Sequence, residues 1–206
     1  MEEKNEMIGI VVFAKAIISG ISKTRIASLH GIDTADSIYR ELLKVTSNLV
    51  SQFCYHVAFT GDSEPIGLRE YFDGAMSFFP QAGETLGERL YNASKHMFQM
   101  GCSGVIAIGC DCPYMHVDDL KRAIDVLGRG YHVAIGPAND GGYYLIGTKP
   151  AALCLFNVKS WSQPTLFEDT MHLFKEGKFS YIVLPHRSDI DTMEDFIAWQ
   201  NYQNNQ

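Results

Sequence analysis

The stretch Gly136-Pro137-Ala138-Asn139-Asp140-Gly141-Gly142-Tyr143-Tyr144-Leu145-Ile146-Gly147 places one acidic residue and two adjacent glycines between two apolar, strand-like runs. Paired glycines supply no side chain to a core and lose much backbone entropy on folding. They are therefore tolerated best where the chain needs unusual dihedral angles or where a ligand approaches the backbone. Asp-Gly between two strands is also a strong hairpin signal. The stretch alone permits two interpretations, a structural turn or a binding loop.

Further apolar runs of strand length lie on both sides of this stretch. The predicted strands cover residues 8–13, 55–59, 105–108, 133–135, 143–146 and 181–184. Most of them lack strict alternation, which is typical of strands covered on both faces of a sheet. Between them, apolar residues recur at helical spacing within 38–49, 86–97 and 117–127. We expect one domain over residues 1–206, a three-layer α/β/α sandwich with a mainly parallel, Rossmann-like sheet.

Three of the expected helices have recognisable starts. Thr85 with Glu88 three residues later fits a capping box, and so does Thr192 with Asp195, which opens a final helix through Trp199. Either His116 or Asp118 is expected to cap the helix within 117–127.

Composition narrows the classes of function. The 206 residues carry a net charge of -7, and clustered Lys and Arg are scarce, which argues against a nucleic-acid partner. The five cysteines are an odd number without the spacing of a disulfide scaffold, so we expect reduced thiols in a cytoplasmic protein. The opening segment Met1–Glu6 is acidic, and the apolar run 7–14 is short, so neither an export signal nor a membrane span is expected.

Four residues with useful chemistry each follow a predicted strand: Lys15, Asp111, Asp140 and Asp189. In open α/β sheets the ligand crevice lies outside the carboxyl ends of the strands, so these residues should meet at one edge. Any single aspartate after a strand is more often a helix cap or turn former, whereas four such residues at once are less easily explained in that way.

The loop after the first strand combines Lys15, Gly20, Lys23 and Arg25. Backbone amides at a helix start, a flexible glycine and basic side chains supply the donors and charge that a di- or triphosphate needs. The loop lacks the glycine spacing of a Walker A motif. A solvated basic turn is the alternative.

The acidic positions suggest a metal ion. Asp111 ends a buried strand and is followed by Pro113, a costly place for a charge without a partner. Mg²⁺ typically uses one or two carboxylates together with substrate phosphates, so Asp111 fits without a full protein cage. Asp189 and Asp191 either add ligands to that ion or simply favour the start of the final helix. A zinc site at Cys110, Cys112 and His116 is disfavoured, because alternate residues of a strand end point in opposite directions.

Taken in order, six motifs resemble the bacterial DUF2064 family of small glycosyltransferase-like proteins. They are Lys15-Ala16 with Lys23-Thr24-Arg25, Gln81-Ala82-Gly83 with Leu86-Gly87-Glu88-Arg89, Gly109-Cys110-Asp111-Cys112-Pro113, Gly136 to Tyr143, Trp161-Ser162, and Asp189-Ile190-Asp191-Thr192. The family is similar to nucleotide-diphospho-sugar transferases of the GT-A fold and to the guanylyltransferase that activates phospholactate or phosphoenolpyruvate in deazaflavin-cofactor synthesis. The resemblance covers nearly the whole chain.

The resemblance implies a role for each matching position. The nucleotide-binding residues would be Phe13, Ala14, Lys15, Gly20, Lys23, Arg25, Gln81 and Gly83. The catalytic residues would be Lys23 and Asp111, and Mg²⁺ or Mn²⁺ would be held by Asp111, Asp189 and Asp191. The transferred group or acceptor would face Asp140, Gly141, Gly142 and Tyr143. One departure is Ile17, where the family usually has proline. A more flexible loop with lower nucleotide affinity is expected there.

Three hypotheses follow for the function. The first is a metal-dependent transferase that takes a nucleoside triphosphate or a nucleotide sugar as donor and a small molecule as acceptor. The second is a non-catalytic, nucleotide-binding regulatory protein on the same fold, and the third is an interaction module whose acidic loops only cap helices. The nucleotide base, the transferred group, the acceptor and the oligomeric state stay open, with a homodimer possible. The aromatic stretch 71–79 fits a subunit contact, an acceptor wall or core.

Overall fold

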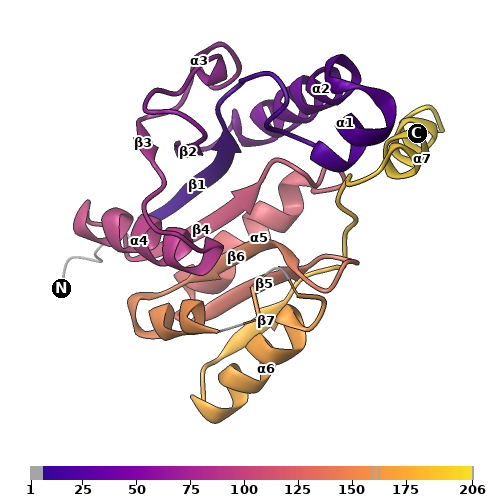
Figure 1. The fold of residues 1–206 in the computed structure, drawn as a ribbon. Coiled ribbons are helices and arrows are strands. Elements are labelled where there is room, and N and C mark those ends of the chain that lie inside the picture. Colours follow the sequence, from indigo (N-terminus) through magenta and orange to yellow (C-terminus); the bar gives the residue numbers. More distant parts are fainter. Residues whose placement is uncertain (1–6, 159, 162, 206) are drawn as a thin grey trace.

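The computed structural model describes residues 7–158, 160–161 and 163–205, and its strands form one sheet with helices on both faces (Figure 1). The strands are β1 (Ile8–Lys15), β2 (Tyr55–Thr60), β3 (Phe78–Pro80), β4 (Gly104–Gly109), β5 (Val133–Pro137), β6 (Tyr143–Thr148) and β7 (Tyr181–Val183). The helices are α1 (Thr24–His30), α2 (Ile32–Val50), α3 (Leu68–Tyr71), α4 (Leu86–Gln99), α5 (Val117–Gly128), η1 (Pro150–Asn157, a 3₁₀ segment), α6 (Leu166–Glu176) and α7 (Met193–Gln203). The expectations for Met1–Glu6 and for Ser162 fall outside the described residues.

The strand order is β3-β2-β1-β4-β6-β5-β7, and only β6 runs antiparallel to its neighbours. This confirms the predicted sandwich with a mainly parallel sheet. It also confirms the hairpin interpretation of 136–147, because β5 and β6 pair antiparallel and residues 138–142 join them. The connection between these two strands is a tight turn rather than a helix.

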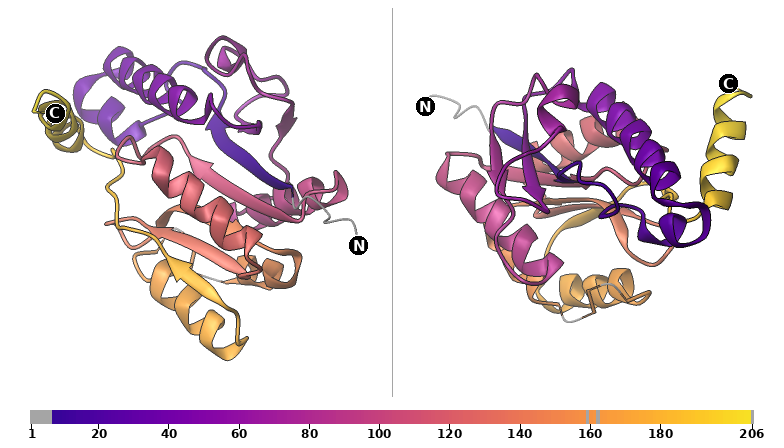
Figure 2. Two further views of the ribbon diagram at one scale, coloured as in Figure 1. Left: turned by 180° about the vertical axis from the view of Figure 1, so that it is seen from behind. Right: turned by 45° about the horizontal axis from the view of Figure 1, so that its top comes forward.

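Alternate residues of the central strands supply the two halves of the core. Ile10, Val12 and Ala14 of β1 are buried in the cluster that includes α2 and α5, whereas Val11 packs in the cluster that includes Met97 of α4. In Figure 1 α4 crosses the front of the sheet, and the view from behind in Figure 2 brings α5 forward. Burial of β1 on both faces explains why its sequence is continuously apolar.

Two predicted capping boxes are present. The Glu88 N–H donates to Thr85 Oγ1 at 3.2 Å, and the Thr85 N–H donates to the Glu88 carboxylate at 3.2 Å. Thr192 and Asp195 make the same exchange at the start of α7. At α5 the cap is His116 rather than Asp118, and its N–H donates to the Asp119 carboxylate at 2.9 Å. These short-range signals fix where the helices begin.

Several elements were not predicted from the sequence. These are β3, α1, α3, η1 and α6. The aromatic stretch 71–79 contributes mainly to the core: Phe72 is buried, and Tyr71 and Phe78 pack against the same cluster. β3 has only three residues, too few for a recognisable strand pattern, and it is defined by pairing with β2.

Helix α7 lies apart from the sheet, beside α1 (Figures 1 and 2). Its Trp199 and Phe196 are buried with Ile26 of α1 and Ile38 of α2. None of the described helices is both long and apolar enough to cross a membrane.

The hairpin turn depends on a glycine at position 141. Gly141 has φ 90°, and a Cβ there would stand 1.9 Å from the Pro164 carbonyl oxygen. We expect Gly141→Ala to lower the free energy of unfolding by at least about 1 kcal/mol, because the left-handed backbone disfavours a Cβ and the start of α6 must move. Urea denaturation measures the change. Gly142→Ala is the matched control, since its Cβ would meet only the Asp140 carboxylate at 3.2 Å. An equal loss in both variants would contradict this explanation.

Candidate active site

The residues that follow β1, β4, β5 and β7 meet in one cleft. Lys15, Asp111, Asp140 and Asp189 all line it, and its volume is about 640 Å³. The prediction that these four residues lie at one edge of the sheet is therefore confirmed. The parallel strands bring them together, because their carboxyl ends emerge side by side.

An ion pair between Lys23 and Asp111 lies within this cleft. Lys23 Nζ is 2.5 Å from Asp111 Oδ1 and also donates to the Ile190 carbonyl oxygen at 2.5 Å. The Lys23 side chain is only 5% exposed, whereas that of Asp111 is 54% exposed. Lys23 is the N-cap of α1 and has a left-handed backbone, φ 49°. Such a conformation is unfavourable for a residue with a Cβ and is found most often at functional positions.

A second, exposed ion pair joins the same two segments. Arg25 donates to Asp191 Oδ2 at 2.9 Å, and both side chains are largely open to solvent. Two cations of the predicted phosphate loop therefore contact two of the carboxylates predicted to bind metal. A phosphate and a divalent ion entering the cleft would compete with these contacts.

Asp189 is the carboxylate least satisfied by protein. Its Oδ1 is buried and has no hydrogen-bond partner among the described residues. Burial, followed by the charges of Asp111 and Asp140, raises the pKa of Asp189 to about 7. An orphaned oxygen beside a second carboxylate is a site that a cation would stabilise.

The carboxylates of the cleft therefore suit a metal ion whose remaining ligands come from the substrate and from water. Among the described residues, no three His, Cys, Asp or Glu side chains are grouped so that they could hold an ion. Mg²⁺ needs only one or two carboxylates when substrate phosphates and waters complete its shell, and Asp111 and Asp189 meet that requirement. Cys110 and Cys112 do not contribute thiolates, because burial raises the pKa of both thiols.

The end of β1 is rigidly held. The Tyr39 hydroxyl accepts the Lys15 N–H at 2.7 Å and donates to the Lys15 carbonyl oxygen at 2.8 Å. Burial raises the pKa of Tyr39 well above its usual value, so the hydroxyl stays protonated and keeps both bonds. The sequence analysis gave Tyr39 no role, because a hydroxyl 24 residues from its partner leaves no local pattern.

Most of the predicted nucleotide-binding residues line the cleft. Those that do are Phe13, Ala14, Lys15, Lys23, Arg25 and Gln81. Gln81 Nε2 donates to the Ala58 carbonyl oxygen at 2.9 Å, which fixes its orientation at the end of β2. Gly20 and Gly83 are not among the lining residues. Gly83 has φ 125°, and a Cβ there would stand 2.6 Å from Glu88 Cβ, so this glycine serves the turn before α4.

Of the four hairpin residues predicted to face the transferred group or the acceptor, three line the cleft and one does not. Asp140, Gly142 and Tyr143 line the cleft, and the Gly142 N–H donates to Asp140 Oδ1 at 2.9 Å. Gly141 is not among the lining residues and packs against Pro164, which is.

Trp161 is a cleft residue whose role the sequence analysis left unassigned. Its Nε1–H donates to the Phe156 carbonyl oxygen at 3.2 Å, and its ring stands edge-on to Tyr143 with centroids 5.8 Å apart. The ring rests on Gly87, where a Cβ would be 2.1 Å from Nε1. Trp161 thus forms a fixed aromatic part of the cleft lining. Leu86, Arg89, Leu90 and Gln163 also line the cleft.

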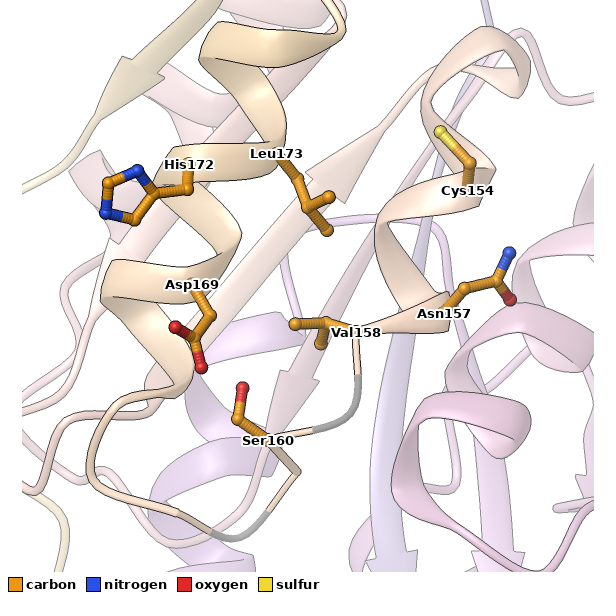
Figure 3. Close-up of a pocket in the computed structure, with 7 residues that line it drawn as sticks. All are labelled: Cys154, Asn157, Val158, Ser160, Asp169, His172 and Leu173. Atoms are coloured by element: carbon orange, nitrogen blue, oxygen red, sulfur yellow. The ribbon is translucent and has the colours of Figure 1, made fainter.

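A second cavity, of about 740 Å³, lies between η1 and α6 (Figure 3). Its lining residues are Cys154, Asn157, Val158, Ser160, Asp169, His172 and Leu173, none of which lines the first cleft. Cys154 and His172 stand on opposite sides of it in Figure 3, so these reactive side chains do not converge. The first cleft is therefore the candidate active site.

Ile17, which stands where the family usually has proline, contacts the segment before α3, and the expected flexibility and lower nucleotide affinity stay predictions. Its N–H donates to the Ile66 carbonyl oxygen at 2.8 Å, and its side chain packs so closely on Gly67 that a Cβ there would stand 2.9 Å from Ile17 Cβ. Proline has no N–H to donate. This chain anchors the segment with a hydrogen bond in place of a stiff ring.

This anchor can be measured with two variants. We expect Ile17→Pro to be less stable than Ile17→Ala by roughly 1 kcal/mol, since both lose the side chain but only the proline loses the hydrogen bond to Ile66. Chemical denaturation of the two variants gives the difference. A proline variant as stable as the alanine variant would show that the bond contributes nothing.

Comparison with known proteins identifies a family and a fold for this chain. A model of the family described as "Uncharacterized protein conserved in bacteria (DUF2064)" matches residues 47–163. No curated protein matches the sequence. The structure of a "putative nucleotide-diphospho-sugar transferase" from Desulfovibrio desulfuricans G20 is similar with a TM-score of 0.82 and 28% identity, covering 90% of this chain and 82% of that one.

Two more distant structures share the fold. The 4-diphosphocytidyl-2C-methyl-D-erythritol synthase from Anaerococcus prevotii has a TM-score of 0.65 at 14% identity, covering 97% of this chain and 96% of that one. Glucosyl-3-phosphoglycerate synthase from Mycobacterium tuberculosis, in complex with Mn²⁺, UDP and glucosyl-3-phosphoglycerate, has a TM-score of 0.57 at 11% identity and covers 94% of this chain and 75% of that one.

Proposed function

The chain belongs to the DUF2064 family and is a transferase with the nucleotide-diphospho-sugar transferase fold, and on this premise we propose that its reaction is metal-dependent. The proposed donor is a nucleoside triphosphate or a nucleotide sugar, and the proposed acceptor is a small molecule. Mg²⁺ or Mn²⁺ is the proposed ion, with Asp111 and Asp189 as its protein ligands and Asp191 at the edge of the same site.

One observation carries this proposal: cations and carboxylates from distant parts of the chain face each other in a single cleft. Lys15, Lys23 and Arg25 line it together with Asp111 and Asp189, and Lys23 pairs directly with Asp111. The cations suit the phosphates of a donor, and the carboxylates suit the divalent ion that accompanies them. Stability alone does not require cations and carboxylates together at the edge of a sheet, because a charge there that lacks a partner is costly.

The residues of the chain have distinct tasks in such a transfer. Displacement at phosphorus or at an anomeric carbon builds negative charge on a phosphate leaving group, and Lys23, almost fully buried, would neutralise that charge from a fixed position. A bound divalent ion would supply further stabilisation of the same charge. Tyr39 holds Lys15 in place, while Asp140, Gly142 and Tyr143 face the space left for the transferred group or the acceptor.

The solved structures of the same fold are consistent with this division. Glucosyl-3-phosphoglycerate synthase holds Mn²⁺ and UDP, which pairs a divalent ion with a nucleotide. The structure from Anaerococcus prevotii is, by its name, that of a synthase whose product carries a diphosphocytidyl group. Both a nucleotidyl transfer and a sugar transfer therefore agree with the fold, and the donor decides between them.

Calorimetry of the purified protein tests the proposal. The titrants are GTP, CTP, UTP, ATP, UDP-glucose and GDP-mannose, each with Mg²⁺ or Mn²⁺ and each with EDTA. We expect metal-dependent binding of one donor, and the identity of that donor separates a nucleotidyltransferase from a sugar transferase. Binding that is unchanged by EDTA would contradict metal dependence. Tight binding without product by mass spectrometry would favour the regulatory alternative.

The Asp111→Asn variant tests the site itself. We expect it to abolish turnover and to weaken metal-dependent donor binding at least tenfold, because the amide cannot replace a charged metal ligand. Asp118→Asn is the control: it removes a charge from an exposed residue seven positions later on α5. Thermal unfolding of both variants checks that the fold is intact. Wild-type activity in Asp111→Asn would refute the assigned role.

A further inference from the structure

The chain between β7 and α7 crosses the carboxyl ends of the strands, and we call residues 185–190 the crossover segment. In Figure 1 this part of the chain runs from β7 up toward α7. Hydrogen bonds tie it to three strand ends. The Tyr144 hydroxyl donates to the Pro185 carbonyl oxygen at 3.1 Å, the Arg187 N–H to the Pro137 carbonyl oxygen at 3.1 Å, and the Ile190 N–H to the Asp111 carbonyl oxygen at 2.8 Å.

An ion pair between the partly buried Arg187 and the buried Asp119 holds the middle of this segment. Arg187 donates through Nε to Asp119 Oδ2 and through its terminal nitrogen to Oδ1, both at 3.1 Å. Asp119 lies in the first turn of α5 and is only 4% exposed, and its Oδ2 also accepts the His116 N–H. The carboxylate is therefore fixed before Arg187 reaches it. A bidentate fork of this kind restrains the direction of the arginine as well as its distance.

Such a pair contributes little to stability compared with apolar residues of the same size, because taking both charges out of water is costly. A positional role accounts for it better. The crossover segment brings Asp189 toward Asp111, and two carboxylates at one site repel each other when both are charged. Without a restraint nearby, Asp189 would gain by moving out to solvent.

We infer that Arg187 is a positioning residue, which by pairing with Asp119 holds the crossover segment so that Asp189 stays opposite Asp111. This inference rests on the proposed function, since it gives the two carboxylates a shared cation. Arg187 does not line the cleft itself and acts only through the backbone that carries Asp189. Helix α5 thereby sets the geometry of a site to which it contributes no proposed ligand.

The test replaces the pair without leaving a buried charge. The double variant Asp119→Asn/Arg187→Gln removes both charges and leaves a polar side chain at each position, so it is expected to fold. The matched control is Asp125→Asn/Arg129→Gln, which removes an exposed pair on the same helix, with side chains 51% and 71% exposed. Arg187→Lys keeps the charge and loses the fork.

Two measurements are made on each protein. Hydrogen exchange reports the protection of the Arg187 and Ile190 amides, and calorimetry reports the binding of Mn²⁺ with inorganic pyrophosphate, the diphosphate that all proposed donors contain. In the double variant we expect exchange of these amides to quicken about tenfold and the dissociation constant to rise about tenfold or more, in the range typical of residues that orient metal ligands. Amides of β1 should keep their protection, the control should match wild type, and Arg187→Lys should fall between.

Three results would overturn the inference while leaving the proposed function in place. The first is wild-type amide protection in the double variant, and the second is faster exchange with unchanged Mn²⁺-pyrophosphate binding. Equal weakening in the control pair would also overturn it, because the effect would then follow from charge alone. Failure of the wild-type protein to bind Mn²⁺ with pyrophosphate would instead refute the proposed function, and the positioning role with it.

Discussion

The parallel pairing of β1 with β4 is the constraint on which the site depends. In this register Phe13 lies opposite Gly109, so Lys15 and Asp111, each two residues further on, emerge at the same level. Both strands are buried on both faces, and a shift of one residue would move every side chain to the opposite face, where it would no longer fit its packing partners. The hydrophobic core thus sets the separation of a cation and a carboxylate that make no contribution to it. Packing of β1 and β4 in the core therefore sets the positions of Lys15 and Asp111 at the edge of the sheet.

The same edge concentrates features that are unfavourable for stability. Lys23 adopts a left-handed backbone and buries its ammonium group beside Asp111, and a buried oxygen of Asp189 has no hydrogen-bond partner in the part of the chain that the structure describes. Backbone strain of this type costs on the order of 1–3 kcal/mol. The surrounding structure holds these groups in place through fixed points on other elements, such as the Tyr39 hydroxyl on Lys15 and Asp119 on Arg187. A cleft built this way is organised before a ligand arrives, which reduces what binding must reorganise.

Much of this arrangement could be predicted from the sequence, because it depends on short-range patterns. Continuous apolar runs gave six of the strands, and the boxes at Thr85 and Thr192 gave two helix starts. The proximity of Lys15 and Asp111 could be predicted because each lies at the carboxyl end of a predicted strand. What could not be predicted depends on pairs far apart in the chain. Lys23 and Asp111 are 88 positions apart by number and Arg187 and Asp119 are 68 apart, so no local pattern announces either contact. The three-residue β3 is likewise defined by its neighbour β2 and not by its own composition.

The stretch 136–147 shows why a structural and a functional interpretation need not compete. The hairpin explains Gly141, whose left-handed backbone and contact with Pro164 leave no room for a side chain. It also accounts for the hydrogen bond from the Gly142 N–H to Asp140, but not for the fact that Asp140 and Tyr143 line the cleft from the same turn. A tight turn between antiparallel strands places its residues at one end of the sheet. In this sheet the carboxyl ends of the parallel strands lie at that same end. The glycines make the turn possible, and the turn brings its neighbours to the cleft. The turn requires its glycine, and the cleft requires an acidic and an aromatic residue beside that glycine. Both requirements together explain why this stretch has so unusual a composition.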